Sequence, residues 1–485
     1  MSNYLSNEEL DSELVIGLVC AVGTESRLVI DLLKERLGLA GYRVEVAKIS
    51  RDVIPRLVEV PFDAKESFER YSALMTAGNQ CRAISGIEAL GDDSILALGA
   101  SAHIAALRKN ISDESDEDDG ETSPPSKVAY IIDSLKRPEE VEKLRVIYPS
   151  GFVLLGIHAD FQIRRNHLIQ DKGMSMEQAD SLLARDSEEA KEPHGQRVNS
   201  TFHLADFFVQ IQGSREALRN DIKRLVELWF GNPFLTPTFD EYAMFFAFAA
   251  ALRSADLSRQ VGAVVTRRNE IVATGANDCP AAGGGLYWAI RNEQTGKVED
   301  ASAGRDYMRP DGDSLIEQSN CESLNRSFKR QKRLVIDLMK FIAQVLKQSG
   351  IKDLTEFGRV VHAEMEALLS YDRKNGISTT GAAFTAPHFL VITAQSISSQ
   401  PGFLASSMLN PTRKVRPFHF MMTRFSLPER IIRWRSVEPF AGVGPRRLFE
   451  LFSVNLGSVI SYRESRQTPG KSRTGVSKRP SFGYK

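Results

Sequence analysis

The sequence predicts an α/β protein of two domains, and two observations support this fold class. Over residues 1–230, apolar segments of strand length alternate with amphipathic helices, which is typical of a parallel sheet covered by helices on both faces. Over residues 236–460, an apolar helix precedes a short hairpin and further helices, which predicts a helix–sheet–helix domain. A basic segment at 461–485 follows and is expected to be flexible.

The composition is that of a globular protein. The 485 residues are 42% hydrophobic and 26% charged, which fits two or three domains with sizeable cores. The net charge is zero, so the molecule as a whole has no electrostatic attraction to nucleic acid or to a membrane. No apolar stretch reaches the roughly 18 residues that cross a bilayer, and no signal peptide is recognisable. The cysteines lack paired spacing, which predicts a reducing, cytoplasmic compartment: they are Cys20, Cys81, Cys279 and Cys321.

The first domain shows a strand–helix–strand rhythm. An apolar strand at Leu14–Val19 leads through a glycine-containing turn into a helix, and an alternating strand follows at 42–50. Two buried strands are expected at 127–135 and 151–159, with a helix over Pro138–Arg145 between them. These strands predict the parallel sheet.

An acidic segment at 112–127 interrupts this domain. It holds seven Asp or Glu residues together with Ser, Gly and Pro, so it cannot bury enough apolar surface to fold. We expect a disordered insertion there; a binding segment for basic partners is the alternative.

The turn after the first strand, "GLVCAVGTES", lies where a phosphate-binding loop would lie. Backbone N–H groups and a helix N-terminus at such a turn can hold a phosphate. The Walker motif requires Gly, four residues, then Gly-Lys-Ser/Thr. Here five residues separate Gly17 from Gly23, and Thr24 stands where lysine is needed. Two interpretations remain open: an ordinary strand-to-helix turn, or a nucleotide-binding or vestigial kinase-like loop.

The second domain begins with a helix that Thr236 or Thr238 could cap. Its expected apolar side comprises Tyr242, Met244, Phe245, Phe248 and Leu252. Two short strands joined at Arg267–Asn269 predict a hairpin. A long amphipathic helix is expected at 327–350.

The segment "VVHAEMEALLS" has the most specific chemistry in the chain. A His followed two residues later by Glu at a helix start is half of the zinc deaminase signature, whose other half is a distant P-C-x-x-C. In such a site His362 would bind Zn²⁺, and Glu364 would move protons between water and the leaving amine. A capped helix with a surface His and Glu would have the same sequence.

The segment about a hundred residues upstream favours the functional interpretation. It contains Arg259, which could meet a phosphate, and Asn277, which could hydrogen-bond a sugar hydroxyl. The alternatives are a solvated charge for Arg259 and a turn residue for Asn277.

Together these segments resemble the two-domain bacterial anti-phage dCTP deaminases, relatives of dCMP deaminase with an N-terminal P-loop kinase-like domain. The resemblance covers most of the chain, from "GLVCAVGTES" through "AYIIDSLKRPEEVEKLR", "ALRSADLSRQVGAVV", "GANDCPAAGGGLYW" and "HAEMEALL" to "EPFAGVGPRRLFELFS". It implies a P-loop-like parallel sheet domain followed by a cytidine-deaminase-like α/β/α domain.

The resemblance also implies a function. This function is zinc-dependent, hydrolytic conversion of dCTP, or of dCMP, to the deoxyuridine nucleotide, which would deplete dCTP and starve phage replication. By the same resemblance His362 is the zinc ligand and Glu364 the proton shuttle. The implied partners are the deoxycytidine nucleotide, a nucleotide at the N-terminal domain, a regulatory RNA and further copies of the chain; no membrane partner is implied.

The sequence departs from this family at the second half of the zinc site. Two cysteines are expected near Leu390–Ala394, and neither is present. If the codons of this segment are read one base out of register, they permit T-T-F-P-C-H-N-C-A-K-H-I, which contains the missing P-C-x-x-C. The same offset permits family-like sequence downstream, and the original frame resumes by "VEPFAGVGPRR". We therefore expect that residues 382–436 are out of frame and that the printed chain is inactive.

Two other functions remain as alternatives. One is a nucleotide-binding regulatory or kinase-like protein whose second domain is a non-catalytic, deaminase-like scaffold. The other is a non-catalytic interaction protein.

Overall fold

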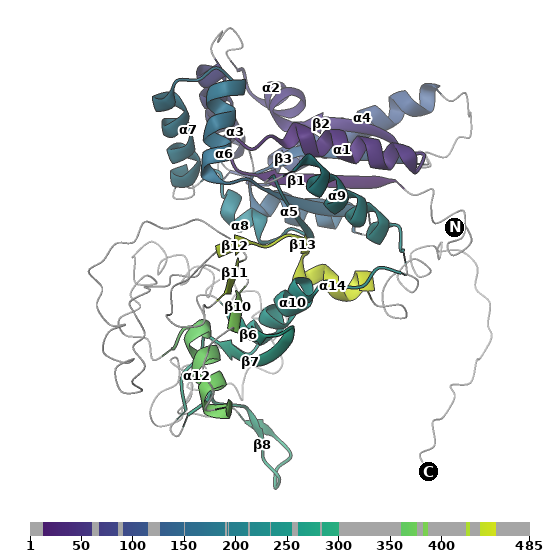
Figure 1. The fold of residues 1–485 in the computed structure, drawn as a ribbon. Coiled ribbons are helices and arrows are strands. Elements are labelled where there is room, and N and C mark those ends of the chain that lie inside the picture. The colour runs from purple at the N-terminus through teal and green to yellow at the C-terminus, as the bar shows by residue number, and fades with distance from the viewer. Residues whose placement is uncertain are drawn as a thin grey trace, which may run out of the picture.

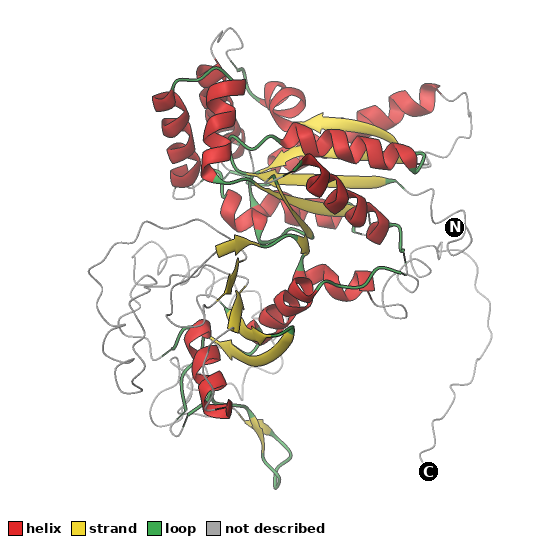
Figure 2. Cartoon of the chain, in the orientation of Figure 1, coloured by secondary structure: helices red, strands yellow, loops and turns green. Residues whose placement is uncertain are grey.

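The described residues form two large sheets with helices around each, and a separate two-stranded hairpin (Figures 1 and 2). The computed structural model describes residues 13–60, 67–85, 91–114, 127–149, 151–189, 192, 194–211, 214–232, 234–254, 260–281, 284–299, 360–375, 382–386, 423–426 and 437–452. No helix within these ranges is long and apolar enough to cross a membrane. Several expected features lie outside them, including Cys321, Arg259, the helix at 327–350, the segment Leu390–Ala394 and the basic segment 461–485.

The first sheet is mostly parallel, which confirms the α/β class. Its strand order is β13-β5-β4-β1-β3-β2, in which only β13 runs antiparallel to its neighbour. The strands are β1 (Leu14–Cys20), β2 (Arg43–Lys48), β3 (Val128–Leu135), β4 (Phe152–His158), β5 (Phe207–Gln210) and β13 (Gly442–Val443). The strands expected from the sequence are thus confirmed to within a residue or two. Strand β1 is central: β3 and β2 lie on one side of it, and β4 and β5 lie on the other. The carboxyl end of β1 is therefore the point where the strand order reverses, which is where ligands bind in open α/β sheets.

Helices cover both faces of this sheet because its strands are apolar on both sides. Leu14, Ile16 and Leu18 pack with one set of helices, whereas Val15 and Val19 pack with the other set. The first set is α1 (Ser26–Leu39), α9 (Arg215–Trp229) and α14 (Pro445–Phe452); the second includes α4 (Ile95–Glu114), α5 (Pro138–Ile147) and α8 (Val198–Phe202). Beside them lie α2 (Ile54–Leu57), α3 (Ser67–Ile84), α6 (Phe161–Asn166), α7 (Met176–Glu188) and the π-helical turns Ile49–Val53 and His167–Asp171. Helix α4 extends to Glu114 and so includes the first residues of the segment expected to be disordered, whereas residues 115–126 lie outside the described ranges.

The second sheet is antiparallel, in the order β12-β11-β10-β6-β7. Its strands are β6 (Gly262–Arg267), β7 (Glu270–Ala276), β10 (Ala382–Ala386), β11 (Thr423–Ser426) and β12 (Val437–Pro439). The expected hairpin is confirmed, with Arg268 and Asn269 in the left-handed turn at φ 50° and 60°. A separate hairpin joins β8 (Ile290–Arg291) to β9 (Val298–Glu299).

Two helices pack on opposite faces of the β6–β7 hairpin (Figure 1). Helix α10 (Phe239–Ala251) packs on Val264, whereas α12 (Ala363–Asn375) packs on Ala263 and Val265. The described residues therefore show the expected helix–sheet–helix arrangement.

The buried face of α10 agrees only in part with the expected one: Met244 is buried as expected. Thr238 is the cap and forms a reciprocal capping box with Glu241. The buried positions are mainly alanines, whereas Tyr242 and Leu252 are 44% and 67% exposed. The reason is close approach: a Cβ added at Gly262 would lie 2.1 Å from the Ala247 carbonyl oxygen, which leaves room only for small side chains.

The segment 437–452 connects the two sheets. It contributes β12 to the second sheet, then β13 and α14 to the first. Residues 442–452, which the sequence assigned to the second domain, therefore pack against the first.

Candidate active site and phosphate loop

The start of α12 lies beside the end of β7. Val361 donates its N–H to the Asp278 carbonyl oxygen at 3.1 Å, and these residues form an antiparallel bridge. The "GAND" segment and the "HAE" segment are thus neighbours in space, as a shared site requires. The sequence separation of these segments gives no direct information about this contact.

A glycine sets how closely α12 approaches the sheet. A Cβ added at Gly275 would lie 2.1 Å from the Ala363 carbonyl oxygen and 2.3 Å from the Ala367 nitrogen. Only glycine permits this distance, so Gly275 determines where His362 and Glu364 lie relative to β7.

The two polar side chains of the HAE segment have different environments. His362 is exposed, whereas Glu364 is partly buried. Burial raises the pKa of Glu364, against smaller opposing effects of a backbone hydrogen bond and of His362. A carboxyl group with a raised pKa is suited to taking up and releasing a proton. Two residues further, buried Glu366 accepts a hydrogen bond from Arg373 at 2.5 Å and is structural.

The described residues do not fit a zinc ion. Among them, no group of three or more His, Cys, Asp or Glu side chains is arranged to hold a metal. A catalytic zinc site needs three protein ligands, and His362 is the one that the motif supplies here. No step through zinc is therefore derived for the printed chain.

Asn277 is buried and its side-chain oxygen has an internal partner. This oxygen accepts a hydrogen bond from the Val261 N–H at 2.6 Å, and Ser254 donates to the Asn277 carbonyl at 2.6 Å. Asn277 thus holds Val261, the residue before β6, against the end of β7. Its hydrogen bond to a sugar hydroxyl stays a prediction, as does the phosphate contact of Arg259.

Of the three loop residues expected in the N-terminal domain, one lies in a strand. Gly17 is inside β1, where an added Cβ would lie 2.8 Å from Leu135 Cδ1 and 2.9 Å from the Phe152 ring. Its role is therefore close packing. Gly23 and Thr24 do lie in the loop between β1 and α1, and Gly23 adopts φ +83°.

The loop does not fit a nucleotide phosphate as it stands. It has no lysine, and the Val22 N–H already donates to Asp186 Oδ2 at 3.0 Å. An added Cβ at Gly23 would lie 2.8 Å from the Arg164 carbonyl oxygen, so α6 occupies the space beside the loop. A lysine from another segment contacts the start of the loop: Lys136 Nζ donates to the Cys20 carbonyl at 2.6 Å.

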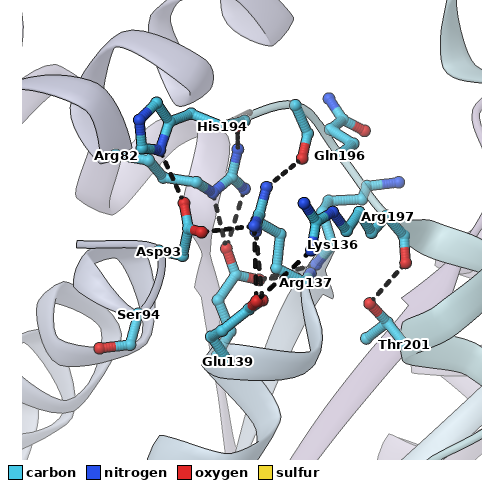
Figure 3. Close-up of polar contacts among 12 residues, drawn as sticks. Arg82, Asp93, Ser94, Lys136, Arg137, Glu139, His194, Gln196, Arg197 and Thr201 are labelled. Atoms are coloured by element: carbon cyan, nitrogen blue, oxygen red, sulfur yellow. Dashed lines mark hydrogen bonds and ion pairs between the residues drawn. The ribbon is translucent and has the colours of Figure 1, made fainter. Parts of the chain in front are cut away.

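A network of ion pairs lies at the start of α5. It includes Arg137, which follows Lys136 in the sequence. Figure 3 shows Arg137 between the acidic side chains of Asp93 and Glu139, with Arg82 and Arg197 nearby. Arg137 is 1% exposed, pairs with Asp93 and Glu139, and donates to the Gly195 carbonyl at 2.6 Å. These contacts join α5 to residues 194–197, and the network is structural.

Sequence reasoning missed Lys136, Arg164 and Asp186 around the loop. Asp186 lies in "LLARDSEEA", which has the composition of a surface helix. No local signal distinguishes it, because its partner Val22 is 164 residues away in the chain.

Replacing Gly275 by alanine is expected to lower the free energy of unfolding by about 1–3 kcal/mol, because α12 must move away from β7. Denaturant unfolding measures this change, and hydrogen exchange of residues 363–375 should become faster. Gly38→Ala in α1 is the matched control: an added Cβ there meets nothing within 4 Å, and stability should stay equal or rise by about 0.5–1 kcal/mol. Equal stability of the two variants would contradict the close-packing role.

Comparisons with known protein families and with curated proteins give no match. Solved structures with similarity include TT1252 from Thermus thermophilus, at 18% identity over 44% of this chain and 97% of that chain, with a TM-score of 0.25. A gluconokinase from Sinorhizobium meliloti 1021 is 11% identical over 46% of this chain and 97% of that chain, with a TM-score of 0.23. Dephospho-CoA kinase from Campylobacter jejuni is 13% identical over 45% of this chain and 98% of that chain, with a TM-score of 0.24. At TM-scores this low the similarities carry no argument, and the α/β class rests on the strand order of the first sheet.

Proposed function

We propose that the chain derives from a zinc-dependent deaminase of deoxycytidine nucleotides, dCTP or dCMP, with a P-loop-like first domain and a deaminase-like second domain. The observation that carries the proposal is the placement of Glu364. Burial raises the pKa of Glu364. Glu364 lies at the start of α12, and Val361, just before this helix, pairs with Asp278 of the "GAND" segment.

The chemistry assigned to Glu364 is proton transfer. In hydrolytic deamination the oxygen of water forms a bond to C4 of the cytosine ring, and the bond from C4 to the exocyclic nitrogen breaks. Ammonia leaves and a deoxyuridine nucleotide remains. Glu364 would take the proton from water and deliver it to the ring nitrogen and then to the leaving amine.

The printed chain lacks the ligands for this reaction, and we propose that a frame change across 382–436 removed them. The return of family-like sequence at Val437 supports this interpretation. From that point Phe440, Val443 and Leu448 are buried against the first domain. The role in phage defence, the regulatory RNA and self-association remain predictions from the resemblance.

The test compares the printed chain with a frame-restored chain, in which codons 382–436 are read one base out of register. The restored chain should bind about one zinc per chain and release ammonia from dCTP or dCMP, whereas the printed chain should do neither. Within the restored chain, Glu364→Gln should lower kcat by about 10²–10⁴-fold and keep its zinc. Glu270→Gln, at the exposed first residue of β7, is the matched control and should keep full activity.

Two results would refute the proposal. One is stoichiometric zinc and deamination by the printed chain. The other is a restored chain that folds and binds no zinc. Phosphorylation of a deoxynucleotide by either chain would instead favour the kinase-like alternative, against which the loop without lysine argues.

A further inference from the structure

The loop after β1 is closed by a distant segment of the same chain. Val22 donates its N–H to Asp186 Oδ2 at 3.0 Å and accepts a hydrogen bond from Arg164 Nη1 at 3.1 Å. Arg164 lies in α6 and Asp186 in α7, so these two helices contact the loop from one side. The contact is tight, because the Arg164 carbonyl lies 2.8 Å from an added Cβ at Gly23.

The surroundings of the loop favour an anion. The loop links the central parallel strand to α1, and α1 begins without a side-chain cap. Backbone N–H groups at such a helix start bind negative charge. Two cations, Lys136 and Arg164, also donate to carbonyl oxygens of residues 20 and 22. The carboxylate of Asp186 accepts a hydrogen bond from this loop, and those of Asp133 and Asp160 also act on Cys20 and Arg164.

Several buried polar atoms at this place lack a partner within the described part of the chain. They are Asp186 Oδ1, Arg164 Nε and Thr24 Oγ1. Asp186 is 8% exposed. A buried carboxylate oxygen without a donor is costly, and a group with more oxygens could satisfy the guanidinium and the hydroxyl together.

We propose that Asp186 occupies the position of a phosphate group, so that the loop is an anion site blocked by the chain's own carboxylate. A phosphate-bearing ligand binds only by displacing Asp186, and this displacement moves α7 away from the loop. In the closed state, the anion site of the N-terminal domain is therefore filled by Asp186, and the domain responds to a phosphate-bearing ligand by opening. This inference is independent of the deaminase proposal.

Pyrophosphate serves as the probe, and the full chain is used. Asp186→Ala removes the internal anion and should bind pyrophosphate at least about tenfold more tightly than the unchanged chain, by calorimetry. Asp186→Asn keeps an acceptor for Val22 but loses the charge, so its affinity should be intermediate. Asp180→Ala is the control, since Asp180 is on the same helix and pairs with Arg165 at 2.6 Å on the surface. Its affinity should match that of the unchanged chain.

Hydrogen exchange gives a second, local measurement. In Asp186→Ala, residues 21–27 should exchange faster than in the unchanged chain, and pyrophosphate should restore their protection. In the unchanged chain, saturating pyrophosphate should speed exchange in 176–188, because α7 leaves the loop. Equal affinities of the unchanged chain and both Asp186 variants would overturn the proposal. If Asp186→Ala does not fold, the affinity of Asp186→Asn decides the same question.

Discussion

Replacing Glu241 by alanine is expected to lower the free energy of unfolding by about 3–5 kcal/mol. The Glu241 carboxylate is fully buried and receives both Nη atoms of Arg224, at 2.7 and 2.9 Å. It also accepts from the Thr238 N–H at 2.7 Å and the Val443 N–H at 2.8 Å. Its removal would leave a cation and two backbone donors without their acceptor.

Denaturant unfolding measures this loss, and Glu227→Ala is the matched control. Glu227 is on α9 with Arg224 but pairs with Lys223 on the surface at 3.7 Å, so its replacement should cost at most about 0.5 kcal/mol. Hydrogen exchange of residues 442–452 should become faster in Glu241→Ala alone, because Val443 loses its acceptor. A Glu241→Ala chain as stable as the control would show that this carboxylate does not hold the two domains together.

Replacing Glu140 by alanine should have an effect of similar size, about 3–5 kcal/mol. Glu140 is fully buried, and one of its oxygens receives Arg82 Nη2 at 2.8 Å and Nε at 3.2 Å. The other oxygen accepts the backbone N–H groups of Lys136 and Arg137, at 2.7 and 3.2 Å. Arg82 is 2% exposed, so its charge would remain buried without this partner.

Thermal and denaturant unfolding test this prediction. Glu142→Ala, at an exposed position of the same helix, should change stability by no more than about 0.5 kcal/mol. The double variant Arg82→Met with Glu140→Met should recover much of the loss, since it removes both buried charges. Independent, additive effects of the two single substitutions would contradict a coupled ion pair.

Local patterns predicted the elements that depend on neighbouring residues. The apolar strands at 14–19 and 127–135 became β1 and β3, because continuous apolar runs need burial on both faces. Thr238 capped α10, and Arg268 and Asn269 formed the hairpin turn, because caps and two-residue turns depend on a few adjacent side chains.

Local patterns failed where distance along the chain mattered. Of the apolar residues of α10 that were expected to face the core, Met244 does so, whereas Tyr242 and Leu252 are exposed. Ala243, Ala247 and Ala251 are buried beside Met244, because Gly262 lets the helix approach the sheet closely. Gly17 lies inside the strand predicted at Leu14–Val19 and not in the turn that follows it, and the need for glycine there comes from Leu135 and Phe152, which fill the space of a side chain.

By itself, the sequence determined the α/β class, the order of the strands along the chain and the residue types of the HAE segment. Tertiary structure alone decided that Asp186 closes the loop at Val22 and that Glu241 accepts from Val443, pairs separated by 164 and 202 residues. The physical reason is that each bond depends on two surfaces meeting after the sheets have formed. Neither the charge nor the periodicity of either segment specifies its partner.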